Sequence, residues 1–185
     1  MNFDYNAFSH GQIQSKIWLC ENLEPHLPPY AQVAIIGSWY NALGFIMLAR
    51  NEKKYNMIMG VDKDQNSVDI ANKLTDGWAL GMDFKARNTC SDIENYDFRS
   101  YNVVINTSCE HMNTDWFSKV NPYQLVCIQS SDMVTDDPGW NITNSNSSLE
   151  EFKKKYPMSQ ILFEGEKLFD YGHLVYNRLM LIGRL

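Results

Sequence analysis

The sequence predicts an α/β fold in which a mostly parallel β-sheet is covered by helices on both faces. The first observation behind this prediction is an alternation, from residue 32 onward, of short β-branched runs with segments of helical periodicity. Strands that alternate with helices form parallel sheets with right-handed crossovers. The second observation is that two strand-like segments end the chain without a helix between them. We expect these two segments to form an antiparallel pair added to the parallel sheet.

The first predicted element is a helix over residues 8–23, because apolar side chains recur there near the helical period. The side chains of this apolar face are Ile13, Ile17, Leu19, Cys20 and Leu23. The prolines that follow end the helix, since proline cannot continue one. With 185 residues, the chain is long enough for one domain. We expect residues 1–30 to form a helical cap segment and residues 31–185 to form the core of that domain.

The alternation of strands and helices starts after this cap segment. A β-branched run over residues 32–36 predicts the first strand, and a helical pattern over residues 42–50 predicts the helix after it. The sequence "NMIMGV" predicts a second strand over residues 56–61, and "SVDIANKL" predicts a helix over residues 67–74. A third strand is predicted over residues 82–87.

The alternation continues in the second half of the chain. The sequence "NVVIN" predicts a fourth strand over residues 102–106, and a short helix is predicted over residues 114–119. The sequence "QLVCIQ" predicts a fifth strand over residues 124–129. The polar segment 130–148 is too long for a plain connection, and such loops are usually either disordered or functional. A helix over residues 148–156 follows it.

The last two strands are predicted over residues 159–169 and 176–185. In an open sheet of this kind, ligands bind beyond the carboxyl ends of the strands, where the strand order reverses. We expect this reversal between the first and fourth strands. The loops after Ile36, Val61 and Ile105 are therefore predicted to converge on one crevice.

The composition narrows the possible functions. The net charge is −6, and no positive surface of the kind that binds nucleic acid is indicated. The first 50 residues show no secretory signal, and no apolar run reaches the ~20 residues of a membrane span. The four cysteines are far apart and match no metal-binding or disulfide pattern. We expect a cytoplasmic protein without a metal site.

The segment after the first strand resembles a nucleotide-binding turn. Gly37 permits a tight turn and a close approach to a ligand, and Gly44 permits close packing of the next helix. Ser38 and Asn41 are able to cap that helix, whose free N–H groups favour an anionic group. A purely structural strand–turn–helix explains these residues equally well.

Asp62, followed by Lys63, ends the second strand. A carboxylate at this position accepts hydrogen bonds from the ribose hydroxyls of a nucleoside. The alternative is a helix cap or turn aspartate, but together with Gly37 the position favours a nucleoside site. In the next loop, Asp92 is expected near an adenine amino group and Ile93 against the ring.

The end of the fourth strand supplies the candidate catalytic residues. Asn106 and Thr107 are expected to face the crevice, and Glu110 and His111 follow them. A histidine at a strand's carboxyl end can act as a general base near neutral pH, although a structural role explains His111 equally well. His173, in the final hairpin, is a second candidate.

Cys109 lies beside these residues. It is interpreted as a core residue, because no neighbouring residue is seen to lower its pKa.

These segments in order resemble the motifs of class I S-adenosylmethionine-dependent methyltransferases. The matching stretches are "VAIIGSWYNALG", "MIMGVDKDQNSVDIANKL", "TCSDIENY", "YNVVINTSCEHM" and the closing "LFDYGHLVYNRLMLIGRL". The resemblance covers residues 32–185. It implies a three-layer Rossmann-like sandwich around a seven-stranded, mostly parallel sheet with one antiparallel C-terminal strand.

The resemblance also implies S-adenosylmethionine as cofactor. It assigns Asp62 to the ribose, and Asp92 and Ile93 to the adenine. Residues from Asn106 onward, including Thr107, would border the methyl group. The residues assigned to the methionine part are Gly37, Ser38, Trp39 and Tyr40.

The sequence departs from that family at the glycine-rich turn. Ile35 stands where the family usually carries an acid, and Trp39 and Asn41 replace later glycines. The bulky rings of this turn are expected to form a wall of the pocket. Gln12 or Lys16 is a candidate partner for the ligand's carboxylate, although Lys16 is better explained as a solvated surface residue.

The leading hypothesis is a methyltransferase that acts on a small-molecule acceptor, with His111 as first and Glu110 as second candidate base. In this hypothesis Met133 and Trp140 of the long polar loop form an apolar wall for the acceptor. Two alternatives stay open. One is a methyltransferase-like nucleoside-binding or partner-binding module without catalysis, and the other is a dinucleotide-dependent oxidoreductase.

Overall fold

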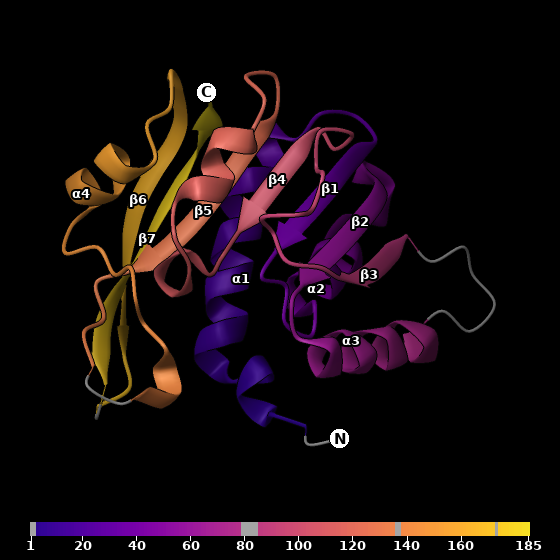
Figure 1. Ribbon diagram of the computed structural model, residues 1–185, viewed down its shortest axis with the longest axis horizontal. Helices are drawn as coiled ribbons and strands as arrows, with labels where there is room; N and C mark the ends of the chain where they lie inside the picture. Colours follow the sequence, from indigo (N-terminus) through magenta and orange to yellow (C-terminus); the bar gives the residue numbers. More distant parts are fainter. Residues whose placement is uncertain (1–2, 79–84, 136–137, 173) are drawn as a thin grey trace.

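The computed structural model describes residues 3–78, 85–135, 138–172 and 174–185 (Figure 1). It contains a seven-stranded sheet of order β3-β2-β1-β4-β5-β7-β6. The strands are β1 (Ala31–Ile36), β2 (Tyr55–Asp62), β3 (Ala86–Cys90), β4 (Val103–Asn106), β5 (Leu125–Ser131), β6 (Gln160–Asp170) and β7 (Val175–Arg184). The candidate base His173 lies outside the described residues.

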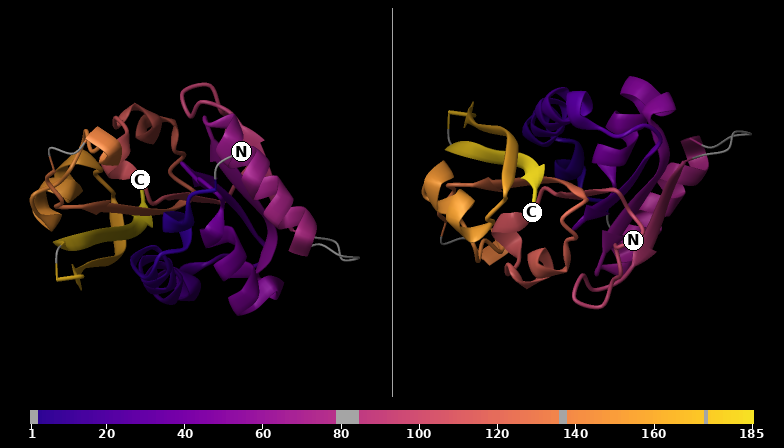
Figure 2. Two further views of the ribbon diagram at one scale, coloured as in Figure 1. Left: turned by 90° about the horizontal axis from the view of Figure 1, so that it is seen from below. Right: turned by 90° about the horizontal axis from the view of Figure 1, so that it is seen from above.

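Helices cover both faces of this sheet, as Figure 2 shows when the sheet is seen nearly edge-on. The α-helices are α1 (His10–Leu23), α2 (Ala42–Asn51), α3 (Gln65–Trp78) and α4 (Leu149–Lys155). The 3₁₀ helices are η1 (Tyr5–Phe8), η2 (Glu24–His26), η3 (Glu52–Lys54), η4 (Cys109–His111), η5 (Asp115–Lys119) and η6 (Pro138–Trp140). No helix in the described ranges is long and apolar enough to cross a membrane.

The sheet has the predicted switch point. Strand β1 pairs in parallel with β2 on one side and with β4 on the other, and β5 continues the parallel set. Strand β7 is antiparallel to both β5 and β6, which confirms the prediction of an antiparallel C-terminal pair. The order of the strands therefore reverses between β1 and β4, and this is the place where an α/β sheet opens a crevice.

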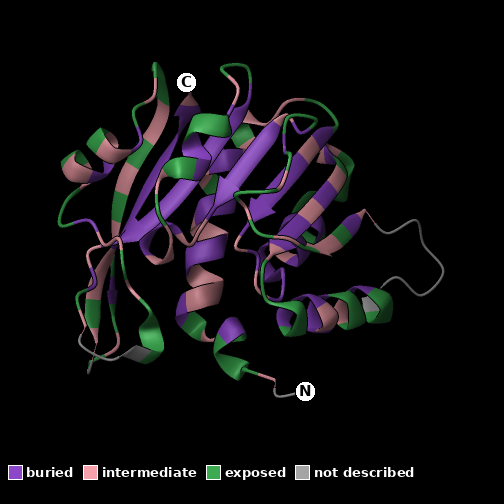
Figure 3. Cartoon of the chain, viewed as in Figure 1, coloured by how far each residue is buried: buried purple, intermediate pink, exposed green. Residues whose placement is uncertain are grey.

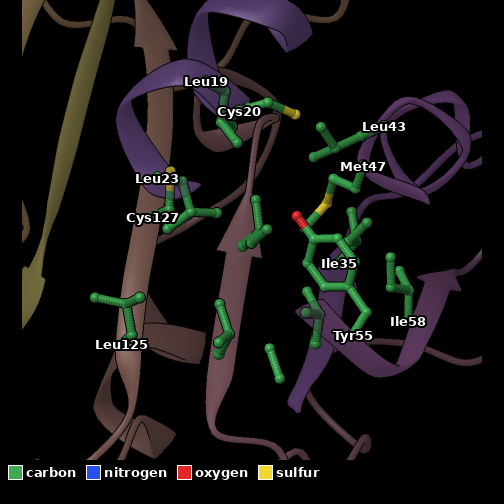
Figure 4. Close-up of a cluster of buried hydrophobic side chains, with 14 of the residues drawn as sticks. Leu19, Cys20, Leu23, Ile35, Leu43, Met47, Tyr55, Ile58, Leu125 and Cys127 are labelled. Carbon is green, nitrogen blue, oxygen red and sulfur yellow. The ribbon is translucent and has the colours of Figure 1, made fainter. Parts of the chain in front are cut away.

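Each central strand alternates its side chains between two hydrophobic clusters, one on each face of the sheet. In β1, Val33 and Ile35 pack in the cluster beneath α1 and α2, whereas Ala34 and Ile36 pack in the opposite cluster with α4 and η5. Figure 3 shows the resulting buried centre, and Figure 4 shows side chains of α1 and α2 meeting the strands. Burial on both faces explains why these strands read as continuous apolar runs.

The third strand is present but lies nearer the C-terminus than predicted. The sequence indicated residues 82–87, whereas the described strand is Ala86–Cys90. Pairing with β2 sets its position, because Ile58 is opposite Ala86 and Asp62 is opposite Cys90. This edge strand is mostly polar, so its hydrophobic pattern could not reveal it. Residues 82–84 lie outside the described part.

The buried stripe of α1 differs from the predicted apolar face. Ile13 and Ile17 are only half-buried. The buried positions of α1 are Gly11, Ser15, Lys16, Leu19, Cys20 and Leu23. The prediction that Lys16 is a solvated surface residue was therefore wrong. Its position, three and four residues before Leu19 and Cys20, puts it on the face that packs against the sheet.

Candidate functional site

A cavity of about 440 Å³ opens at the carboxyl ends of the parallel strands. It is lined by the loops that follow β1, β2 and β4, so the predicted convergence of these loops is confirmed. Pockets for small molecules and cofactors usually have volumes of roughly 300–1,000 Å³. Residues of α1 and of the segment before it line the same cavity, at the edge of the sheet where the N-terminal segment lies (Figure 1).

The loop after β1 has an alternating left-handed backbone. Gly37, Trp39 and Asn41 have φ angles of 60°, 51° and 54°. Asparagine tolerates this region, but a bulky residue such as tryptophan adopts it only at a cost of roughly 1–2 kcal/mol. The loop therefore has a glycine-type backbone at two positions, Trp39 and Asn41, that do not carry glycine.

Hydrogen bonds to β2 hold this backbone in place. The backbone N–H of Trp39 donates to Oδ2 of Asp62 over 2.8 Å. The backbone N–H of Ser38 donates to the carbonyl of Val61 over 3.1 Å. The turn at Gly37 and the carboxylate of Asp62 thus lie side by side at one rim of the sheet, and strain at Trp39 is offset by these contacts.

The side chain of Asn41 connects the loop to both neighbouring elements. Its Oδ1 accepts a hydrogen bond from the N–H of Gly44, which caps α2, and its Nδ2 donates to Oδ1 of Asn88 on β3 over 2.8 Å. A Cβ atom at Gly44 would lie 2.5 Å from Oδ1 of Asn41, and one at Gly60 would lie 2.8 Å from its Nδ2. These glycines leave the room that the asparagine needs.

We expect Asn41→Ala to lower the free energy of unfolding by about 1 kcal/mol more than Asn41→Gly does. Both variants lose the cap and the bond to Asn88, but only alanine places a Cβ in the left-handed region. Urea unfolding of the two variants measures the difference. Equal stabilities would contradict a left-handed backbone at this position.

Asp62 has hydrogen-bonding capacity to spare. Its Oδ2 accepts from Trp39, and its Oδ1 accepts from the backbone N–H of Asp64 over 3.0 Å. A carboxylate offers about four acceptor positions, so about two are left. Asp62 lines the cavity. The donor and acceptor set at this point therefore fits a group with two adjacent hydroxyls, such as a ribose.

The two aromatic residues of the loop form a wall and leave the cavity open. Tyr40 is buried, and its hydroxyl accepts a hydrogen bond from the backbone N–H of Asp4. Phe3 stacks on the ring of Tyr40 with 5.2 Å between centroids, and the ring of Trp39 lies 5.3 Å away on a tilted plane. The N-terminal segment is thus fastened to the cavity wall through Tyr40.

The loop after β3 supplies the other end of the cavity. Asp92 and Ile93 line it, as do Lys63 and Glu94. The carboxylate of Asp92 accepts from the N–H of Glu94 over 3.0 Å, which orders the turn.

Two residues at the end of β4 lie in different places. Thr107 lines the cavity, whereas Asn106 does not. Asn106 is fully buried, and its side chain accepts from the N–H of Ser108 and contacts the sulfur of Met112. Asn106 therefore shapes the turn before η4.

His111 lines the cavity with one ring nitrogen already engaged. Its Nδ1 lies 3.1 Å from the carbonyl oxygen of Asn141. A carbonyl oxygen only accepts, so Nδ1 carries the proton and Nε2 has the free lone pair. Nε2 lies 3.8 Å from Oε1 of Glu110. Nε2 is therefore the ring nitrogen that is placed to accept a proton.

Glu110 takes part in a buried ion pair that the sequence did not reveal. Its Oε1 accepts a hydrogen bond from Nη1 of Arg178 on β7, and Nη2 of Arg178 donates to the carbonyl of Thr107. Lys16 lines the same end of the cavity, where its Nζ donates to Oε1 of Gln12 over 2.6 Å. The sequence offered one signal for this ion pair: Arg178 stands near the start of a strand, directly before an apolar run.

Burial lowers the pKa of Lys16 to about 7; the charge of Arg178 acts in the same direction, and Glu110 opposes it. Between about pH 7 and pH 10 the unfolded chain holds a proton on Lys16 that the folded chain does not. The free energy of unfolding therefore rises with pH in this window. Burial also raises the pKa of Cys20 to about 12, which lowers stability above its unfolded pKa of about 8.5.

We expect the free energy of unfolding to rise by about 1–2 kcal/mol from pH 7.0 to pH 8.5, and we expect Lys16→Met to remove this rise. Urea unfolding of both proteins at the two pH values tests this. A rise that persists unchanged in Lys16→Met would assign it to another group.

The long loop after β5 approaches the cavity through Asn141. The backbone N–H groups of Thr143 and Asn144 both donate to the carbonyl of Glu110, so the loop is fastened to η4. Within the described part of this loop, neither Met133 nor Trp140 lines the cavity. The lining of this cavity therefore does not include the wall predicted for the acceptor, and that wall stays a prediction.

Cys109, the remaining residue of η4 considered from the sequence, is fully buried. Burial raises the pKa of its thiol, which agrees with its interpretation as a core residue.

Solved methyltransferase structures share this fold, although no protein-family model and no curated protein sequence matches the chain. The magnesium protoporphyrin IX methyltransferase of Synechocystis PCC 6803, with bound S-adenosylhomocysteine, is 13% identical with a TM-score of 0.69. That alignment covers 99% of this chain and 88% of the other.

Two further structures are similar. A geranyl diphosphate methyltransferase with S-adenosylmethionine is 10% identical, with a TM-score of 0.67 and coverage of 94% and 86%. The YcgJ protein of Bacillus subtilis is 10% identical, with a TM-score of 0.64 and coverage of 93% and 99%. At these identities the similarity establishes the fold.

Proposed function

We propose that this chain, which has the Rossmann-like fold of class I S-adenosylmethionine-dependent methyltransferases, is itself such an enzyme and acts on a small-molecule acceptor. The observation that carries the proposal is the contact between the left-handed loop at Gly37 and the carboxylate of Asp62, at the mouth of a cavity of about 440 Å³. In this proposal residues 31–185 form the core of a single domain and residues 1–30 form a cap.

The residues around the cavity fit S-adenosylmethionine as cofactor. Asp62 would accept from the ribose hydroxyls, and Asp92 and Ile93 would flank the adenine. Gly37 lets the loop pack tightly against the turn after β4, because its φ angle is 60° and a Cβ there would lie 3.2 Å from both Ser108 and Met112. Around it, Ser38, Trp39, Tyr40 and Lys63 would enclose the cofactor.

S-adenosylmethionine would supply a methyl group on an electrophilic sulfonium. The protein then has to hold the acceptor in line and remove its proton. In this proposal Nε2 of His111 accepts the acceptor's proton, since Nδ1 is hydrogen-bonded to the carbonyl oxygen of Asn141. Glu110 would support His111 through its charge, and its own bond to Arg178 makes it the second choice as a base.

A small acceptor agrees with the charge of the chain. The net charge of −6 disfavours a long polyanion such as nucleic acid, which would need a positive track. The similar structures include enzymes named for magnesium protoporphyrin IX and geranyl diphosphate, both small molecules.

The four cysteines are free thiols, which supports a location in the reducing cytoplasm.

A binding module without catalysis is the second candidate. It is favoured by Trp39 and Asn41, which stand where the resembling family has glycines. A thermal-shift titration separates the candidates. S-adenosylhomocysteine at 100 times its Kd should add about 2.7 kcal/mol of stability and raise Tm by about 5–10 °C. NAD should leave Tm unchanged. A shift with NAD alone, or with neither compound, would contradict the proposal.

We expect His111→Ala to lower kcat for methyl transfer about 100-fold or more, with the affinity for S-adenosylhomocysteine nearly intact, because a base acts on the acceptor. The rate of methyl transfer from labelled S-adenosylmethionine to a mixture of small molecules that contains the acceptor measures turnover. His26→Ala, in η2, is the control. Unchanged turnover in His111→Ala would remove this residue from the mechanism.

A further inference from the structure

Three charged side chains from three separate elements meet at the end of the cavity away from β3. Lys16 comes from α1, Glu110 from η4 and Arg178 from β7, and all three line the cavity. Their exposed fractions are only 8%, 4% and 8%. Charged residues are rarely buried to this degree unless they are paired, so the cluster calls for an explanation.

The cluster is incompletely satisfied by the protein. Oε1 of Glu110 binds Arg178, but Oε2 of Glu110 and Nε of Arg178 have no hydrogen-bond partner among the described residues. Among the residues that the structure describes, Nζ of Lys16 donates only to the side chain and the carbonyl of Gln12. A buried polar atom without a partner costs about 1–3 kcal/mol. Since Glu110 and Arg178 line the cavity, a polar ligand group that reaches them after a small side-chain movement would remove this cost.

The strand order places this cluster opposite the proposed adenosine site. Asp62 ends β2, and the loop of Asp92 follows β3, on one side of β1. Glu110 and Arg178 belong to the other side, after β4 and on β7. A ligand whose ribose is held by Asp62 and whose adenine points toward β3 therefore extends its remaining part toward Lys16, Glu110 and Arg178.

We propose that Lys16, Glu110 and Arg178 form the subsite for the α-amino-acid end of the cofactor, with Lys16 binding the carboxylate and Glu110 the ammonium group. This inference rests on the proposed function. An amino-acid end carries one negative and one positive group, and the cluster offers two cations and one carboxylate in the complementary arrangement. Glu110 then supplies the negative charge that is missing at Ile35, whose side chain is buried in the hydrophobic cluster beneath α1 and α2. Arg178 positions Glu110.

Binding of such a ligand should be coupled to proton uptake. The pKa of Lys16 is about 7 because of its burial, and a ligand carboxylate beside it would raise that value. The charged groups that act on Lys16 are Arg178 on β7 and Glu110 on η4. His111 lies beside Glu110, and Tyr176 is affected by the charges of both Arg178 and Glu110. A variant at Lys16 is therefore required to show that the proton taken up on binding goes to Lys16.

The test compares S-adenosylhomocysteine with 5′-methylthioadenosine, which keeps the adenosine and the sulfur but lacks the amino-acid end. Calorimetric titration of the full chain at pH 8 gives both affinities. We expect Lys16→Met to lower the affinity for S-adenosylhomocysteine about 10- to 100-fold. The affinity for 5′-methylthioadenosine should stay within about twofold of its value in the unmodified chain. Glu110→Gln should show the same selectivity. Lys154→Met, an exposed lysine on α4, is the matched control.

Calorimetric titration in phosphate and in Tris, two buffers with different ionisation enthalpies, measures how many protons are taken up when the ligand binds. We expect net proton uptake with S-adenosylhomocysteine, none with 5′-methylthioadenosine, and loss of the uptake in Lys16→Met. Equal weakening of both ligands by Lys16→Met, or no weakening of either, would overturn this inference and leave the proposed function intact. Failure of the unmodified chain to bind either ligand would overturn both.

Discussion

Asp62→Ala is expected to weaken the binding of S-adenosylhomocysteine about 100-fold or more. The variant removes the carboxylate that we assign to both ribose hydroxyls, and a hydrogen bond to a charged group contributes about 1.5–3 kcal/mol. It also removes the acceptor for the backbone N–H of Trp39, so the left-handed loop loses a constraint. Calorimetric titration measures the affinity.

A matched pair of asparagine variants separates these two effects. Asp62→Asn keeps an oxygen for Trp39 and loses the charge, and we expect about tenfold weaker binding. Asp64→Asn makes the same chemical change two residues away, where Asp64 caps α3 through the N–H groups of Asn66 and Ser67. Asparagine caps helices equally well, so affinity should be unchanged. Equal affinities of the two variants would remove Asp62 from the ribose site.

Glu110→Leu is expected to lower the free energy of unfolding by about 3–5 kcal/mol, because it leaves Arg178 buried without its counter-charge. The side chains of Glu110 and Arg178 are 5% and 10% exposed, so water cannot replace the lost partner. For a chain of this length, Tm should fall by roughly 6–20 °C. Thermal and urea unfolding measure the loss.

Replacing both partners tests the reason for this loss. The double variant Glu110→Leu with Arg178→Met removes both charges and should recover most of the stability. The ion pair of Lys153 with the exposed Glu150 on α4 gives the control, since Glu150→Leu should change stability by less than about 1 kcal/mol. A double variant as unstable as Glu110→Leu would show that packing, rather than charge, explains the effect.

The central strands were predictable because both faces of each are buried. Val33 to Ile36 and Leu125 to Ile128 read as unbroken apolar runs, since neighbouring residues pack in opposite clusters. The edge strand β3 was misplaced because only Ala86 among its five residues is buried. Its position depends on pairing with β2, which is a property of the folded chain.

The rim of the candidate site was predictable where the residue types at the strand ends indicate it. Gly37 follows a strand directly, and Asp62 ends the next one, so parallel pairing of β1 with β2 brings them together. The charged cluster was not predictable in this way. Lys16 and Arg178 are far apart in sequence and meet only because α1 packs across the sheet near β7. No spacing along the chain marks such a contact.

The central claim is that the Gly37 loop and Asp62 hold one adenosine-containing molecule between them. A crystal structure of the chain with S-adenosylhomocysteine tests it most directly. We predict both ribose hydroxyls within hydrogen-bonding distance of Asp62, adenine beside Asp92 and Ile93, and the amino-acid end directed toward Lys16. A ligand bound elsewhere, or one in the cavity whose ribose makes no contact with Asp62, would contradict the account.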